Sequence, residues 1–297
     1  EAFAAQYGGN FQPTGGTVEI TGVGSNTIYC ENGNYFYNLL INRDPAALSA
    51  IQTNIQVNNN LTVNSGTLFV GWSAYGYTAS VLGGVTINGG VLSVKHSSNL
   101  LLGGSTTLNV NSGGKLSVIG VSGAPGRVSR IATGYYGLNI NSGGAISAQY
   151  GTFEYMNTSG VNLLSGSIVD PVYSFHNCTF QNGQAAGRLM TVENNLTFNV
   201  ENAVFPTNTW SGSYNVYKSV NAGTVNFLTA TGGFAGESFD YDPNNRVNWT
   251  GRMLSLKAYL EGPFNGTTMN TTINGILPLS HPFNVTLPYF GGTPKWY

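Results

Sequence analysis

The chain has 297 residues, of which 8% are charged and 41 are glycine, and its formal net charge is −1. Soluble domains usually carry about 25% charged residues, so this surface must consist mainly of uncharged polar side chains. A chain with a pI near 6.3 lacks the basic surface that nucleic acid or an anionic membrane requires, and we exclude both as partners. We also expect no membrane span, because the sequence contains no apolar run of about 18 residues.

Two short segments precede the repetitive part of the chain. Residues 17–20 and 35–42 alternate apolar with polar side chains, and this pattern predicts a strand in each. Between them and the repeats, Asp44 and Pro45 stand before a short apolar stretch that ends at Ala50. This arrangement predicts one or two turns of helix at most.

Residues 61–148 contain four copies of one short sequence motif, here called the phrase. Its central apolar residue is Val63, Ile87, Val110 and Ile140 in turn, so the steps between copies are 24, 23 and 30 residues. A repeat of this length is typical of a solenoid, in which each copy forms one structural unit.

Each phrase consists of alternating apolar residues, a corner rich in Asn, Ser and Gly, and a second alternating run. This pattern predicts two strands joined at a tight bend, with one face of each buried. One unit cannot bury its apolar face alone, so successive units must stack in parallel. We therefore predict an all-β fold, a right-handed parallel β-helix over residues 27–250. Residues 1–26 form a cap or the first coil, and residues 251–297 form a C-terminal β segment.

Two insertions, at residues 71–77 and 120–137, interrupt the repeats. Insertions in a solenoid gather on one face, which is often the binding face. Aromatic side chains in these insertions could stack on sugar rings, although they could instead pack the loops onto the coil. The candidate glycan-binding residues are Trp72, Tyr75, Tyr77, Tyr135 and Tyr136.

After residue 148 the strands become rich in phenylalanine, which predicts a wider core with stacked rings. The two cysteines, Cys30 and Cys178, are 148 residues apart. At about 24 residues a coil they lie on the order of 29 Å apart along the axis. A disulfide needs Cα atoms within about 7 Å, so we expect two free, buried thiols.

Catalysis and metal binding have weaker support. Glu154, Asp170, His176 and Arg188 could serve a polysaccharide lyase or hydrolase only if they met on one face, and their spacing does not place them there. We expect no enzyme activity. Calcium is the one cofactor considered, at Asp240, Asp242 and Asn244, whose alternating oxygen side chains could surround the ion or could form an ordinary turn.

Several segments resemble a known group of proteins. Residues 36–42 read Phe-Tyr-Asn-Leu-Leu-Ile-Asn, and residues 55–67 combine an Ile-Gln-Val run with Asn-Leu-Thr-Val-Asn-Ser-Gly-Thr. These resemble β-helical repeat regions of large secreted and cell-surface proteins of Bacteroidetes bacteria, and residues 234–249 resemble the closing segment of such regions. Residues 256–283 resemble the opening of the module that commonly follows them, so the C-terminal segment could be the start of a further module or an assembly segment. The resemblance implies export by the type IX secretion pathway and a secreted or cell-surface location. It also implies a C-terminal sorting domain, so we expect either that the chain continues beyond Tyr297 or that this part was removed. The chain starts at Glu1 without an apolar leader, as expected of a processed secreted protein or a fragment.

Three functions remain open. The first is a structural or adhesive extracellular protein, which could self-assemble head to tail into a filament if residues 252–297 cover the next copy. The second is a glycan-binding module that uses the aromatic insertions. The third is a polysaccharide lyase or hydrolase. We expect the first, because a neutral, polar rod can approach another copy without charge repulsion.

Overall fold

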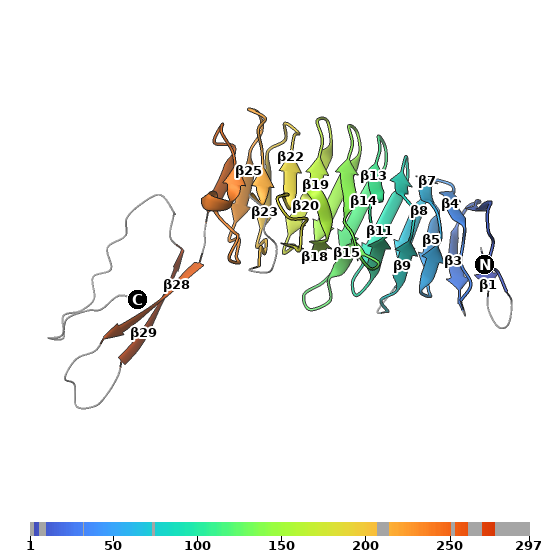
Figure 1. The fold of residues 1–297 in the computed structure, drawn as a ribbon, viewed down its shortest axis with the longest axis horizontal. Coiled ribbons are helices and arrows are strands. Elements are labelled where there is room, and N and C mark those ends of the chain that lie inside the picture. Colours follow the sequence, from blue (N-terminus) through green and yellow to red (C-terminus); the bar gives the residue numbers. More distant parts are fainter. Residues whose placement is uncertain are drawn as a thin grey trace.

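The computed structural model describes residues 3–5, 10–31, 33–72, 75–206 and 214–250, together with the backbone of residues 253–260 and 269–276. The strands wind into a parallel β-solenoid of about ten turns, as predicted (Figure 1). One short 3-10 turn, Glu237–Phe239, accompanies them within the described residues.

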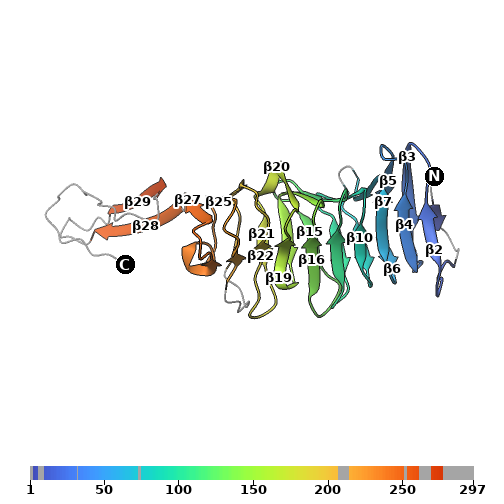
Figure 2. The same cartoon turned by 90° about the horizontal axis from the view of Figure 1, so that it is seen from above.

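Three parallel sheets, here called A, B and C, run along the solenoid (Figures 1 and 2). Sheet A contains β1 (Phe3–Ala5), β3 (Ser25–Cys30), β5 (Leu48–Ile51), β8 (Thr67–Val70), β11 (Val91–Lys95), β14 (Lys115–Ile119), β17 (Ala145–Gln149) and β20 (Ile168–His176). Sheet B contains β2 (Thr17–Ile20), β4 (Asn38–Asn42), β7 (Leu61–Ser65), β10 (Val85–Ile87), β13 (Thr107–Val110), β16 (Tyr136–Ile140), β19 (Met156–Leu163), β22 (Met190–Val192), β24 (Val216–Tyr217) and β26 (Asp240–Tyr241). Sheet C contains β6 (Ile55–Val57), β9 (Thr78–Val81), β12 (Asn99–Leu102), β15 (Gly126–Arg130), β18 (Gly151–Glu154) and β21 (Thr179–Gln181).

Two smaller sheets lie later in the chain. Sheet D consists of β23 (Phe198–Glu201), β25 (Val225–Leu228) and β27 (Val247–Thr250), again in parallel. Beyond it, β28 (Met253–Leu260) pairs with β29 (Met269–Ile276), and this pair is antiparallel. The C-terminal segment therefore contains β structure, but its pairing differs from that of the coils.

Each middle coil has three strands, two of which form at the repeated phrase as predicted. The repeated phrase supplies one strand of sheet B and one of sheet A, and the third strand of sheet C follows it. The predicted insertion at residues 120–137 contains β15, which pairs with β12 and β18, so part of it belongs to the regular coil. The turn at Asp44 is a single hydrogen-bonded turn, with Ala47 N donating to Asp44 O at 2.8 Å, and β5 begins immediately afterwards.

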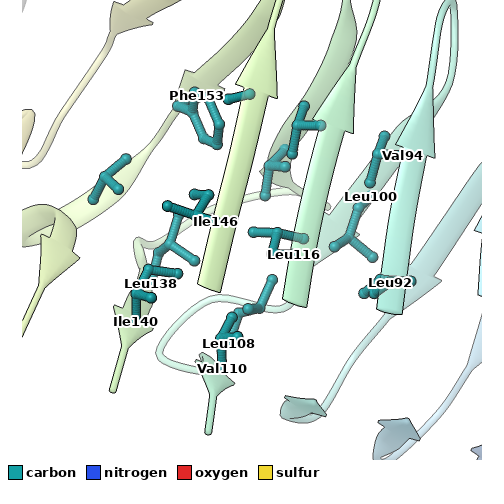
Figure 3. Close-up of a cluster of buried hydrophobic side chains, with 14 of the residues drawn as sticks. Leu92, Val94, Leu100, Leu108, Val110, Leu116, Leu138, Ile140, Ile146 and Phe153 are labelled. Atoms are coloured by element: carbon teal, nitrogen blue, oxygen red, sulfur yellow. The ribbon is translucent and has the colours of Figure 1, made fainter. Parts of the chain in front are cut away.

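The register of the coils builds the predicted interior column. Val63, Ile87, Val110 and Ile140 face one another on β7, β10, β13 and β16, and all four are fully buried. Figure 3 shows apolar side chains from all three sheets meeting inside the middle coils. Because each coil buries its apolar face only against its neighbours, stability is shared along the rod.

Phenylalanine rings continue this column toward the C-terminus, as predicted. Phe180 stacks between Phe153 and Phe205, with ring centroids 5.6 and 5.4 Å away. The stack ends at Phe227 and Trp249, whose rings lie 4.2 Å apart and nearly parallel. The two cysteines are free and buried, which confirms that prediction.

Asparagine side chains form hydrogen-bonded ladders on the outside of sheet B. Asn88 donates to Asn64, Asn111 donates to Asn88, and Asn141 donates to Asn111, at 2.8, 2.8 and 2.6 Å. These residues occupy the corner of each repeated phrase. Gly143, beside the last of them, has φ of 72° and leaves no room for a Cβ against Ser112. The ladders therefore hold successive corners at a fixed spacing.

The N-terminal residues join the solenoid as its first coil. Strand β1 pairs with β3 in sheet A, and β2 pairs with β4 in sheet B. At this end Phe3 and Phe11 pack against the buried ring of Phe36, with centroids 4.9 and 6.0 Å from it. Aromatic rings thus cover the first turn of the apolar column.

Candidate functional site

Exposed apolar side chains gather on sheet A and on the loops that leave it. Of the eleven large apolar residues that are exposed in the described part of the chain, six lie there. They are Trp72, Tyr75, Val121, Ile168, Val172 and Tyr173. Since large apolar groups on a protein surface often mark a binding region, this face is the candidate site.

Trp72 is the most prominent ring of this face. It follows β8 by two residues, it is 41% exposed, and it packs edge-on against Phe69 with the centroids 5.3 Å apart. A short antiparallel bridge to Tyr75 closes the loop that carries it. The indole is therefore held at its base while part of its surface stays open to solvent.

A hollow of about 530 Å³ lies on the C-terminal side of Trp72. Its walls come from three consecutive coils, because Phe69, Lys95 and Ile119 belong to β8, β11 and β14. His96, Gly120 and Val121, which follow the last two strands directly, complete it. The hollow thus depends on the register between coils rather than on any single loop.

A second hollow of about 250 Å³ lies on the N-terminal side of the same indole. Side chains of β3 and β5, including Thr27, Leu48 and Ala50, line it together with Gln52. We call the two hollows together the Trp72 groove. From β3 to β14 the groove crosses five strands, which is about 19 Å along the axis. A groove of this length suits an extended ligand better than a compact one.

Lys95 supplies the positive charge of the groove. Its Nζ lies 4.7 Å from the centroid of the Phe69 ring, a cation–π contact. Partial burial lowers the pKa of its ammonium group. Two ion pairs, Lys115 with Asp170 and Arg127 with Glu154, exist within the described residues, and Lys95 takes part in neither.

The predicted aromatic residues do not form one platform. Trp72 lines the groove, and Tyr75 is 70% exposed on the same loop, whereas Tyr77 packs partly against the core. Tyr135 lies just before β16 of sheet B, where it contacts the guanidinium of Arg130 at 5.6 Å. Sheet B is a different side of the solenoid from the groove.

Tyr136 has to be removed from the glycan-binding set. Its side chain is fully buried in β16, and its hydroxyl donates a hydrogen bond to Val128 O at 3.0 Å. It alternates in phase with Leu138 and Ile140, so it points into the core like them. A ring in this position cannot contact a sugar.

The candidate catalytic residues lie on different sides of the solenoid. Glu154 belongs to sheet C, Asp170 and His176 belong to sheet A, and Arg188 precedes β22 of sheet B. The Arg188 guanidinium stacks on Tyr217 at 3.8 Å. His176 Nδ1 accepts a hydrogen bond from Glu201 N at 3.1 Å. These four groups therefore do not converge.

Glu154 is the most buried carboxylate in the part of the chain that the structure describes, with 3% of its surface exposed. Its oxygens accept hydrogen bonds from Arg127 Nε at 2.5 Å, Ser129 Oγ at 2.9 Å and Gln181 Nε2 at 2.7 Å. Burial alone would raise its pKa, but these bonds and the charge of Arg127 lower it below the ordinary value. The carboxylate is thus fully engaged in tying three strands of sheet C together.

Asp170 is engaged in the same way on sheet A. It accepts from Lys115 Nζ at 2.7 Å and from the backbone N–H groups of Val172 and Tyr173. Burial acts to raise its pKa, and these donors overcome that effect and lower the pKa to about 2. Its hydrogen bonds fix the bulge that exposes Val172 and Tyr173.

Two of the three residues proposed for calcium, Asp240 and Asp242, use their carboxylate oxygens to accept hydrogen bonds within the local turn and strands. Asp242 accepts from the N–H groups of Asn244 and Val247, at 3.3 and 2.6 Å, and Asp240 accepts from Trp249 Nε1 at 2.6 Å. Burial, with the charges of neighbouring carboxylates, raises the pKa of Asp240 to about 6 despite the Trp249 bond. Within the described residues, no group of three or more His, Cys, Asp or Glu side chains is placed to hold a metal ion.

Sequence reasoning identified Trp72 but missed Phe69, Lys95, Ile119 and Val121 as its neighbours. For Lys95 and Ile119, the alignment of the repeats contains a signal. When the four phrases are aligned, Lys95 and Ile119 each directly follow the last buried residue of the second strand. Residues at that position leave the core and lie side by side on sheet A.

Comparison with protein-family models, with curated proteins and with solved structures gave no match. In the part of the chain that the structure describes, no helix is long and apolar enough to cross a membrane.

Proposed function

We propose that this protein is an extracellular structural and adhesive β-helix that binds glycans along the Trp72 groove. The observation that carries the proposal is the pair of hollows on either side of one partly exposed indole, on the face where exposed apolar side chains gather. Ligand sites combine such apolar walls with a few polar groups, which here include Gln52, Lys95 and His96. The rest of the solenoid serves as a rigid support with few charges.

The secreted or cell-surface location belongs to the same proposal. It is supported by the low charge content and by the resemblance of several segments to exported β-helical proteins. A rod whose coils are fixed by asparagine ladders and a continuous apolar column suits a place outside the cell, where stiffness is useful.

We propose binding rather than catalysis. Glu154 and Asp170 hold neighbouring strands by hydrogen bonds and ion pairs, and they lie on different sheets. A polysaccharide hydrolase needs two carboxyl groups within about 10 Å on one side of the substrate. Incubation with the polysaccharides that bind, followed by an assay for new reducing ends or unsaturated sugars, should give no product.

A glycan array with the purified protein tests the binding proposal. We expect the wild type to retain extended polysaccharides and the Trp72→Ala variant to bind them at least about tenfold more weakly, because a central aromatic anchor is lost. Tyr214→Ala is the matched control, since Tyr214 is similarly exposed but lies beside sheet B. Equal binding by wild type and Trp72→Ala would contradict the proposal.

Self-association into a filament remains a separate proposal. The segment that would cover the next copy, residues 252–297, lies largely outside the described residues, and of its side chains nothing is described. Electron microscopy of the protein, with light scattering on the same sample, tests it. Filaments that disappear when residues 252–297 are removed would support head-to-tail assembly, whereas single rods at all concentrations would contradict it.

A further inference from the structure

The two halves of the Trp72 groove differ in charge. The lining residues on the N-terminal side are all uncharged. On the C-terminal side the ionisable lining residues are Lys95 and His96, and no carboxylate lines either half among the described residues. The groove is therefore neutral at one end and positive at the other.

Lys95 is a partly buried cation without a counter-ion among the described residues. Its ammonium group is half-buried beside the ring of Phe69, and within the described residues it forms no ion pair. By contrast, Lys115 on the next strand reaches Asp170 at 2.7 Å. A partly dehydrated charge without a counter-ion is unfavourable, because it has lost hydrogen bonds to water. An anion that enters the groove would replace them with a charge-assisted hydrogen bond.

We propose that the Trp72 groove is specific for acidic polysaccharides, with Lys95 holding the carboxylate of a uronic acid while the sugar ring stacks on Trp72. This inference rests on the proposed glycan binding and adds the class of ligand. Trp72 and Lys95 line the same hollow, so one sugar or two adjacent sugars of a chain can contact both. His96 adds a ring nitrogen to the same wall.

The test uses two polymers that share one backbone, polygalacturonate and its fully methyl-esterified form. We expect the wild type to bind the carboxylate form about tenfold more tightly at low salt, because a charge-assisted hydrogen bond is lost in the ester. This preference should weaken as salt increases from about 0.01 to 1 M, since exposed charges are then screened. Isothermal titration calorimetry at each salt concentration gives both affinities.

Variants separate the two proposals. Lys95→Gln should reduce the preference for the carboxylate polymer to less than about twofold, and Lys95→Arg should keep the preference. Arg246→Gln is the control for charge, because Arg246 bonds Asn221 far along the chain. Far-ultraviolet circular dichroism and a urea midpoint establish that each variant is folded.

The outcomes are distinct. If neither polymer and no other glycan binds, the proposed function fails. If both polymers bind equally and Lys95→Gln changes nothing, glycan binding stands and the specificity for acidic sugars is wrong. If the carboxylate form binds about tenfold more tightly and Lys95→Gln abolishes this preference, both proposals are supported.

Discussion

The phenylalanine column gives a quantitative test of how the C-terminal coils are stabilised. Phe180 is fully buried, and it stacks on Phe153 and Phe205 with interplanar angles of 12° and 17°. Phe175 packs against it at 5.8 Å. Truncation of this side chain removes contacts with three rings, of which Phe153 and Phe205 belong to the two neighbouring coils.

We expect Phe180→Ala to lower the free energy of unfolding by about 3–5 kcal/mol, as for other buried phenylalanines that leave a cavity. Phe180→Leu keeps most of the volume but loses two stacked ring pairs, each contributing about 0.5–1.5 kcal/mol. It should therefore cost about 1–3 kcal/mol. The difference between the two variants separates the cavity from the ring geometry.

Urea unfolding followed by tryptophan fluorescence measures both values, and Trp249 near the end of this column reports on it. Tyr173→Ala is the control, because that ring is 38% exposed and should change stability by less than about 1 kcal/mol. A Phe180→Ala variant within 1 kcal/mol of the wild type would refute the view that the stacked rings form the core of these coils.

Three further predictions concern the polar network, the ladders and the thiols. Glu154→Gln should destabilise the protein by about 1–3 kcal/mol at pH 7, because Arg127 loses its charged partner. Since the folded-state pKa of Glu154 is lowered, the stabilisation by the ionised carboxylate should disappear as the pH falls through and below that pKa. Urea midpoints of wild type and variant that differ by the same amount at pH 3 as at pH 7 would contradict this prediction. Asn111→Asp places a carboxylate against Asn88 Oδ1, two acceptors without a hydrogen, and should cost about 1 kcal/mol in the same assay, whereas an unchanged midpoint would count against the ladder. Burial raises the pKa of Cys178 to about 12, so iodoacetamide at pH 8 should modify it only after denaturation, and rapid labelling of the folded protein, detected by mass spectrometry, would show the thiol to be accessible.

The two strands and the bend of each repeated phrase can be predicted from the sequence, because the pattern that specifies them lies within a few neighbouring residues. Alternation and an Asn-Gly corner specify two strands and a bend without reference to the rest of the chain. The third strand of each coil cannot be predicted in this way. Strands β9, β12 and β15 lack a repeated corner, and β15 stands directly after Pro125, in a stretch that resembles a loop. Their strand structure comes from pairing with the coils on either side.

The groove is harder to predict for the same reason. Trp72 is visible as an aromatic residue in an insertion, but Phe69, Lys95 and Ile119 become its neighbours only through the register of three coils. Tyr136 shows the opposite case, since its alternation with Leu138 already indicates an inward side chain. A residue's place in the alternation therefore predicts more about its role than its presence in an apparent insertion.

The asparagine ladders give the rod a direction. In each asparagine pair, such as Asn88 with Asn64 or Asn248 with Asn226, the later coil donates its side-chain N–H to the oxygen of the earlier one. The amide dipoles of a ladder are consequently aligned along the axis, and each bond polarises the next. One ladder stops at Asn162, whose buried Oδ1 has no hydrogen-bond partner among the described residues. Each ladder therefore has two chemically different ends: its N-terminal end presents amide hydrogens and its C-terminal end presents an amide oxygen.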